Sequence, residues 1–172
     1  SARGSIYRTN ENLDPASGFP VLTAEKLLPK PVAFNGRIAT PLSSDSTLLF
    51  ADTTDNWFIS EPMNAKLRTA PVVWKDKVAA LPRSFESSLY LFDKEGNIVE
   101  GSPIELEGIF AAAPVFFEET KNNPAAAFLS EDGRFFIRSL SQDYAEIASC
   151  DLNTVCKADL VYSTSLRAFF VV

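Results

Sequence analysis

Few side chains in this sequence could carry out chemistry, because its 172 residues include no histidine. Ser-His-Asp and Cys-His catalytic arrangements, His-ligated metals and haem on a proximal histidine are therefore excluded, unless another chain supplies the imidazole. The remaining residues form no recognisable metal or cofactor motif. We accordingly predict a protein that is not an enzyme, with no catalytic residues, no metal and no cofactor.

The two cysteines, Cys150 and Cys156, are separated by five residues in the sequence CDLNTVC. This spacing suits a small loop closed by a disulfide, for which chain entropy gives roughly 2 kcal/mol. The alternatives are two free buried thiols, or a metal site that would need two further ligands. We predict a Cys150–Cys156 disulfide, and with it a location in the periplasm, in the cell envelope or outside the cell.

Acidic residues gather in two short polar stretches, Asp52–Asn56 and Asp93–Asn97. Their oxygens could bind Ca²⁺, which takes six to eight oxygen ligands. Asp and Asn are also typical of hairpin turns, where they bind nearby backbone amides. We predict turns at both places. Glu105 and Glu107 could share one face of a strand, but Glu-x-Glu beside a turn is typical of solvated surface.

Three residues are candidates for ligand binding: Arg37, Arg68 and Trp74. The two arginines precede small-residue–Pro segments and could hold an anion or an acidic peptide if they face a central tunnel. Their alternatives are a solvated strand end or a structural ion pair. Trp74 borders the polar turn of VWKDK and is expected at the surface, where it could bind a sugar, peptide or aromatic ligand. Trp57 lies in a strand pattern and is expected in the core.

The composition favours a single soluble all-β domain over residues 1–172. Hydrophobic residues make up 46% and charged residues 22%, and fourteen Phe against one Met suit strands better than helices. A net charge of −6 without a basic cluster argues against a nucleic-acid partner. No apolar run approaches the roughly 20 residues that span a bilayer.

A repeated pattern organises the chain. Small residues followed by Pro and an aliphatic residue recur at Pro41, Pro71 and Pro114, with a weaker copy at Ser165; these markers are 30, 43 and 51 residues apart. We expect a strand to begin at each marker, because Pro is tolerated at the first residue of a strand. After each marker we expect an apolar strand, a polar turn and an aromatic strand. The predicted strands are 47–50, 57–59, 78–81, 89–92, 125–129 and 135–137.

The two ends of the chain continue each other. Ser88–Ile104 is expected to form two strands around a turn, and Ser5–Val21 echoes it. The fourth copy stops at FFVV, and SARGSIY at the start continues it in phase. We therefore expect the first and last strands either to pair or each to lack a partner strand that was cut away. Because SARGSIY has no initiator Met, we expect a processed chain or an excised part of a longer one. The only mildly helical segment, Leu22–Lys30, is expected to be a connector.

The segments SEDGRFFIRS and SLYLFDKEGNIVEGSPI resemble the recurring unit of PQQ-like and FG-GAP-like β-propeller repeats. The resemblance implies a β-propeller of about four blades closed by the N- and C-terminal strands, or a fragment of a larger ring of six to eight blades. A β-sandwich is the alternative fold. The repeats lack the tryptophan that docks blades in PQQ-dependent dehydrogenases and the Asp-x-Asp-x-Asp-Gly calcium loop. The resemblance therefore implies neither a quinone nor calcium.

Together these features predict a non-catalytic scaffold or binding module of the cell envelope or extracellular space. It would engage a protein or a small ligand through one end face, using loops that differ between repeats. The expected partner is another protein, a second copy or the remaining part of the propeller. The alternative is a part of an envelope enzyme with a propeller fold, either a quinone-dependent dehydrogenase or a glycan-active enzyme.

Overall fold

The computed structural model describes residues 4–7, 9, 12–14, 20–23, 27, 31–42, 46–52, 56–67, 69–110, 112–120, 123–141 and 144–172. These residues form sixteen β-strands and no helix. The strands are β1 (Gly4–Ile6), β2 (Val21–Thr23), β3 (Val32–Phe34), β4 (Arg37–Pro41), β5 (Leu48–Ala51), β6 (Trp57–Ile59), β7 (Val72–Trp74), β8 (Lys77–Ala80), β9 (Ser88–Phe92), β10 (Ile104–Glu105), β11 (Val115–Thr120), β12 (Asn123–Leu129), β13 (Arg134–Ser139), β14 (Glu146–Asp151), β15 (Leu160–Ser163) and β16 (Ala168–Val171). The predicted all-β class is confirmed.

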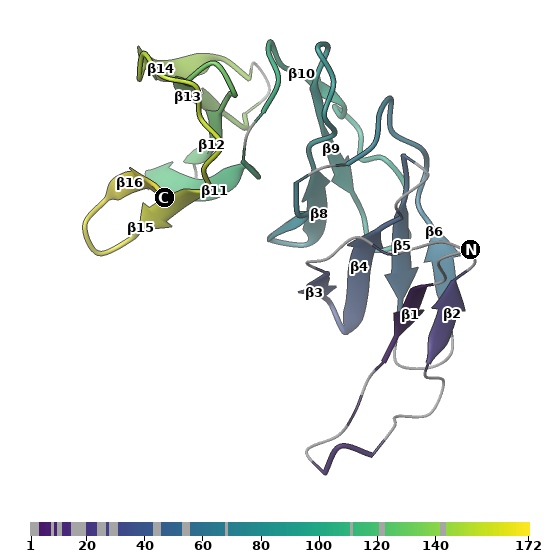
Figure 1. The fold of residues 1–172 in the computed structure, drawn as a ribbon. Helices are drawn as coiled ribbons and strands as arrows, with labels where there is room; N and C mark the ends of the chain where they lie inside the picture. Colours follow the sequence, from purple (N-terminus) through teal and green to yellow (C-terminus); the bar gives the residue numbers. More distant parts are fainter. Residues whose placement is uncertain are drawn as a thin grey trace.

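The strands form five antiparallel sheets, in each of which neighbouring strands follow one another along the chain. Three sheets have four strands in chain order (β3–β6, β7–β10 and β11–β14), and the two terminal sheets, β1–β2 and β15–β16, have two. This arrangement differs from the two facing sheets of a β-sandwich, the alternative fold. The predicted pairing of the first and last strands is absent from the described part of the chain: β1 and β16 share no sheet, and Figure 1 places their sheets at opposite sides of the molecule.

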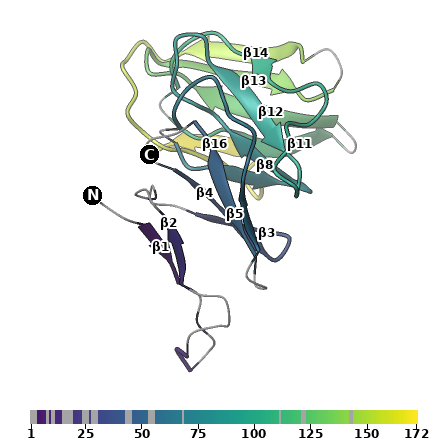
Figure 2. The same cartoon turned by 90° about the vertical axis from the view of Figure 1, so that its right-hand side faces the viewer.

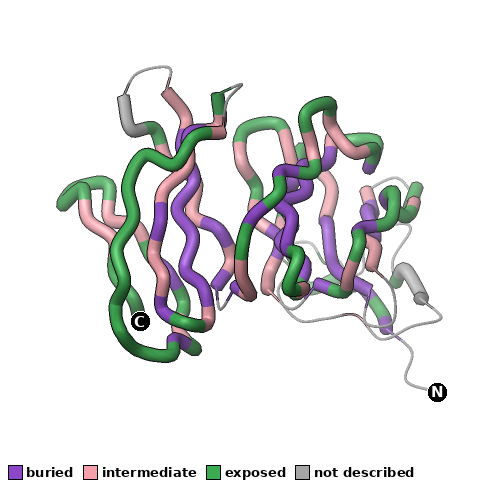
Figure 3. Tube along the Cα trace, turned by 90° about the horizontal axis from the view of Figure 1, so that it is seen from above, coloured by how far each residue is buried: buried purple, intermediate pink, exposed green. Residues whose placement is uncertain are grey.

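The sheets stack face to face in a row, and an apolar cluster fills each of the four interfaces. Figure 3 shows this row from above, with buried chain concentrated in the middle strands. The interface between the second and third four-stranded sheets includes Phe110, Phe128 and Phe136, whose ring centroids lie 5.2–5.9 Å apart. The alanines Ala125–Ala127 are fully buried, so small side chains let neighbouring sheets approach closely.

The first strands of successive sheets lie next to one another. Strand β3 contacts β7, and β11 contacts β15. Trp74 of β7 also stacks on Phe116 of β11, with ring centroids 5.3 Å apart. The last strands, β6, β10 and β14, are therefore the outer edges of their sheets. Figures 1 and 2 both place β14 and the β1–β2 sheet far apart.

The predicted repeat exists, but its register differs from the sequence prediction. The strands that open the three four-stranded sheets follow Pro31, Pro71 and Pro114, which are 40 and 43 residues apart. Pro41 instead ends β4, and Ser165 lies in the β15–β16 turn. Pro at the start of a first strand costs no ladder hydrogen bond, because the donor is not needed there.

The predicted hairpins are largely confirmed. Ser88–Ile104 forms β9, a turn and β10, and its echo forms the β1–β2 pair. The Asp93 carboxylate accepts hydrogen bonds from the backbone amides of Glu95 and Asn97, each at 2.9 Å, as a turn requires. The helical connector over 22–30 is wrong where the structure describes it, since residues 22 and 23 belong to β2 and Leu27 bridges to Leu42.

Candidate functional site

The predicted ligand-binding residue Arg37 makes its contacts with other residues of the protein. Its guanidinium donates a hydrogen bond to the carbonyl of Lys94, lies 3.9 Å from the Asp52 carboxylate and covers the Phe58 ring at 5.2 Å. Since Lys94 belongs to the next sheet, Arg37 joins two neighbouring sheets, which matches the structural alternative. The second predicted arginine, Arg68, lies outside the described residues.

The two tryptophans exchange the environments that the sequence predicts. Trp57 is 54% exposed, so its predicted core position is wrong. Trp74 is half-buried between Phe116 and the ammonium of Lys75, which lies 5.0 Å from its ring. Trp57 lies on the outer strand β6, where alternation places its ring on the face opposite Phe58. Trp74 packs against Phe116 of the neighbouring first strand and stays partly exposed.

The predicted disulfide is absent, because Cys150 and Cys156 are free thiols. Cys150 lies on the exposed strand β14, whereas Cys156 is 4% exposed among Ala112, Leu129 and Leu160. The segment between them crosses from the third four-stranded sheet toward β15, which carries the two sulfurs into different surroundings. The disulfide was the reason for predicting an oxidising compartment, and that reason no longer holds. A location in the periplasm, in the cell envelope or outside the cell stays a prediction.

The feature with the clearest binding geometry is the loop between β8 and β9, residues 81–87, which we call the Phe85 loop. Several hydrogen bonds hold it. Ser87 Oγ donates to the carbonyl of Ser84 at 2.5 Å, and Asn64 Nδ2 donates to the carbonyl of Glu86 at 3.1 Å. The amide of Arg83 donates to the carbonyl of Lys66 at 3.1 Å.

The loop is also joined to the third four-stranded sheet and to the segment after β10. The Arg83 guanidinium lies 2.8 Å from the Glu131 carboxylate, and the amide of Leu106 donates to the carbonyl of Ser87 at 2.8 Å. The loop presents Phe85 to solvent, with 85% of the residue exposed. A large aromatic side chain on a fixed loop loses little conformational freedom when a partner binds it.

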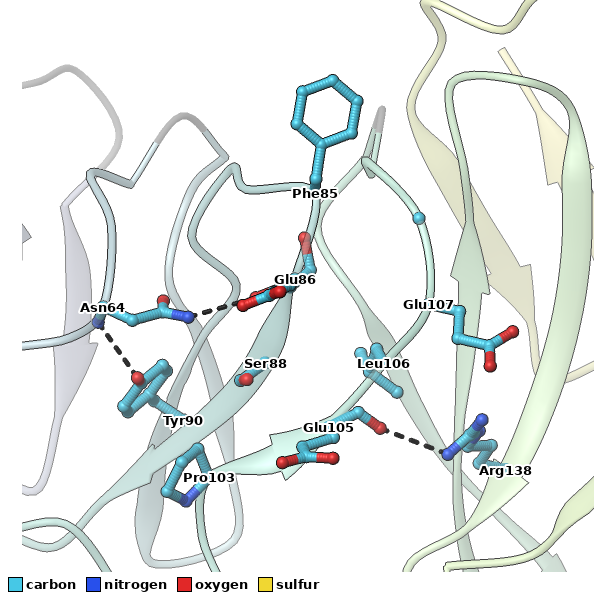
Figure 4. A pocket seen from close by; sticks show the side chains of 12 residues that line it. Asn64, Phe85, Glu86, Ser88, Tyr90, Pro103, Glu105, Leu106, Glu107 and Arg138 are labelled. Atoms are coloured by element: carbon cyan, nitrogen blue, oxygen red, sulfur yellow. Dashed lines mark hydrogen bonds between the residues drawn. The ribbon is translucent and has the colours of Figure 1, made fainter.

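An acidic groove of about 920 Å³ borders Phe85. Buried or half-buried side chains such as Tyr90 and Leu106 line its floor, and the carboxylates of Glu86, Glu105 and Glu107 line its walls. Figure 4 shows the Phe85 ring directed away from the groove, above these carboxylates. Among the described residues Glu86 and Glu105 form no ion pair, and Glu107 lies 3.8 Å from Arg134.

One cation, Arg138, lines the acidic groove, and its guanidinium contacts other residues of the protein. Its guanidinium donates to the carbonyl of Glu105 at 3.3 Å and lies 5.7 Å from the Phe136 ring. Figure 4 shows it beside Glu107, at the end of the groove formed by the third four-stranded sheet. The lining therefore carries three carboxylates against the one guanidinium of Arg138, and Arg134 beside the groove pairs with Glu107, which leaves an excess of negative charge.

A smaller groove of about 480 Å³ also borders Phe85 and is lined by Lys66, Arg83, Ser84, Phe85 and Ile109. Its two charged residues are basic. Arg83 is neutralised in part by Glu131, while Lys66 forms no ion pair among the described residues. Phe85 is thus shared by the linings of an acidic and a basic groove.

Phe85 is not among the residues predicted from the sequence. The only signal for it there is an aromatic residue with polar neighbours in RSFESS, within a loop longer than the corresponding turns. Aromatic residues in the described part of the chain are mostly buried or half-buried, so the sequence alone does not separate Phe85 from the other thirteen phenylalanines. In the described part of the chain, no three Cys, Asp or Glu side chains come together in a way that could hold a metal ion, and no helix is long and apolar enough to cross a membrane.

Comparisons with known protein families and with curated proteins find no match to this chain. Among solved structures, the computationally designed Ika4 protein matches 87% of this chain and 91% of its own, with a TM-score of 0.60 and 10% identity. The computationally designed Ika8 protein matches with a TM-score of 0.53 and 11% identity, and 78% of this chain is covered.

A Bacteroides thetaiotaomicron protein of unknown function matches 86% of this chain, with a TM-score of 0.55 and 14% identity. The chain spans only 39% of the Ika8 protein and 38% of the Bacteroides protein. At these identities the likenesses establish a shared fold and no shared activity.

Proposed function

We propose that this chain is a non-catalytic binding module that engages a protein segment through the Phe85 loop and its two grooves. The observation that carries the proposal is the exposure of Phe85 on a loop held by at least three hydrogen bonds and one ion pair. Isolated exposed apolar residues are common on protein surfaces, but an aromatic residue shared by two grooves has the features of an interface anchor.

We further propose that the scaffold is a β-propeller, in which β15–β16 and β1–β2 are the two halves of a fourth blade. Three four-stranded meanders support this, as do first strands that lie side by side and repeats that begin 40 and 43 residues apart. Four-stranded propeller blades repeat at about 40–45 residues. A site in the cell envelope or outside the cell remains part of the proposal.

The proposal is tested by selecting binders from a phage library of random dodecapeptides on the immobilised protein. Selected peptides are then measured against the Phe85→Ala variant and against Val155→Ala, a matched control that truncates another exposed apolar residue. We expect binding to fall at least tenfold for Phe85→Ala and to be unchanged for Val155→Ala, as for an anchor residue. Peptides that bind both variants as well as the wild type would overturn the proposal.

A further inference from the structure

The two grooves beside Phe85 carry opposite charge, and this polarity restricts what can bind across them. The larger groove presents Glu86, Glu105 and Glu107, and the smaller one presents Lys66 and Arg83. Both include Phe85, so a single extended ligand that passes over this residue can meet both. From this geometry we propose that the partner is an extended peptide segment with a basic residue on one side of an apolar residue and an acidic residue on the other. This inference rests on the proposed binding function.

The acidic side is suited to a lysine or arginine. Glu86 and Glu105 have no ionic partner among the described residues, and Arg138 is committed to the carbonyl of Glu105 and the ring of Phe136. A long basic side chain can lay its methylene stem along an aromatic ring while its charged head reaches a carboxylate. The exposed ring of Phe85 and the neighbouring carboxylate of Glu86 provide these two contacts.

The basic side is suited to a carboxylate. Lys66 and Arg83 are adjacent in space because the amide of Arg83 donates to the carbonyl of Lys66. Lys66 has no ionic partner among the described residues, so its ammonium can pair with an acidic side chain of the ligand. Ile109 also lines this groove and offers an apolar contact beside the charges.

Opposite charges in the two grooves beside one anchor favour one direction of binding. A peptide with only basic residues meets Lys66 and Arg83, and one with only acidic residues meets the three glutamates. Like charges brought together at an interface weaken binding and select against wrong partners. A segment of mixed charge avoids both penalties.

The test uses the Phe85-dependent dodecapeptides from the phage selection and two charge-reversal variants, Glu105→Lys and Lys66→Glu. We expect these peptides to carry a basic and an acidic residue on either side of an apolar one. Each reversal should weaken binding about threefold to tenfold. Reversing the matching charge in the peptide should restore binding, and thermal unfolding followed by circular dichroism checks that each variant is folded.

The possible outcomes separate the inference from the proposed function. Phe85-dependent peptides without this charge pattern, whose binding neither reversal changes, would overturn the inference and leave the function standing. Uniformly basic or uniformly acidic Phe85-dependent binders would also overturn it. If no selected peptide depends on Phe85, both the function and the inference fail.

Discussion

At the scale of single residues, the Asp132 carboxylate takes part in the hydrogen bonds that hold the tight turn between β12 and β13. Ser130 Oγ donates a hydrogen bond to this carboxylate and also accepts one from the amide of Arg134 at 3.0 Å. The hydrogen bond from Ser130, followed by backbone hydrogen bonds, lowers the pKa of Asp132 below its ordinary value, although burial acts in the opposite direction. The hydrogen bonds of this turn therefore favour the charged form of the Asp132 carboxyl.

We predict that Ser130→Ala raises the pKa of Asp132 toward its ordinary value, because the largest cause of the shift is removed. A carboxyl whose pKa is lowered by folding stabilises the folded state at pH values above its ordinary pKa. This stabilisation is lost as the pH falls through the lowered pKa. The variant should therefore lose less stability on acidification below about pH 4. An NMR titration of the Asp132 side-chain carboxyl carbon measures the shift, and an unchanged pKa would contradict the assignment.

The thiols give a second prediction at this scale. Cys150 is exposed on β14 and Cys156 is buried, and both are free. Ellman's reagent should modify one thiol per chain in the native protein and two after unfolding in guanidinium. A Cys150→Ser variant should show no fast-reacting thiol. If neither thiol reacts with Ellman's reagent after unfolding in the absence of reductant, the two cysteines form a disulfide.

At the scale of elements, the β12–β13 turn depends on a glycine. Gly133 has a φ of +91°, and a Cβ added there would lie 2.1 Å from the carbonyl oxygen of Thr154. The amide of Leu152 donates to the carbonyl of Gly133 and the amide of Cys156 to that of Glu131, so the segment that follows β14 packs directly onto this turn. The close approach of the two backbones leaves no room for a side chain.

We predict that Gly133→Ala lowers the free energy of unfolding by roughly 2–3 kcal/mol, since it adds both a clash and an unfavourable φ. The matched control is Gly36→Ala in the β3–β4 turn, where φ is +74° but nothing lies within 4 Å of the added Cβ. The control should lose only about 1 kcal/mol from the backbone conformation. Urea unfolding of both variants measures the difference, and equal losses would contradict the packing described here.

Local elements could be predicted from the sequence because their signals are local. Apolar runs around polar turns correctly predicted β9 with its turn and the β12–β13 hairpin. The register of the repeat was missed, because Pro followed by an aliphatic residue occurs both before β7 and at the end of β4. Only strand pairing distinguishes these two positions.

The candidate site could be predicted much less well. Trp57 and Trp74 both lie in strands, and their exposure depends on which sheet covers each face, which is a property of the stacked sheets. Arg37 was correctly placed near a strand end, but its partners come from residues far along the chain. Phe85 has no strand pattern at all, so its importance follows only from the grooves that distant segments build around it.

At the scale of the whole molecule, the two terminal sheets, β1–β2 and β15–β16, have two strands each where the other sheets have four. Val161 and Phe170 pair in register on the outward face of β15–β16 and are 47% and 43% exposed. In the proposed propeller, β16 would pair with β1, which would remove two free strand edges from the molecule.

Figure 1 places β1 and β16 at opposite sides of the molecule, so closure of the proposed ring would have to bring them together. We predict that in the closed ring cysteines at Ser5 and Phe170, in a Cys150→Ser and Cys156→Ala background, can be joined within one chain by a short bis-maleimide. Mass spectrometry under dilute conditions would detect a cross-linked monomer, and single-cysteine variants are the controls. Cross-linked dimers alone would mean that a second copy completes the sheet, and the absence of any cross-link would contradict ring closure.

We propose that the exposed ring of Phe85, on a loop held by hydrogen bonds and one ion pair, anchors a partner. This anchoring is tested most directly by fluorescence-polarisation titration of the selected dodecapeptides against wild type, Phe85→Ala and Val155→Ala. Since Phe85 is 85% exposed, its truncation should change the free energy of unfolding by no more than about 0.5 kcal/mol. We predict at least tenfold weaker binding for Phe85→Ala alone. Equal affinities for all three proteins would contradict the account.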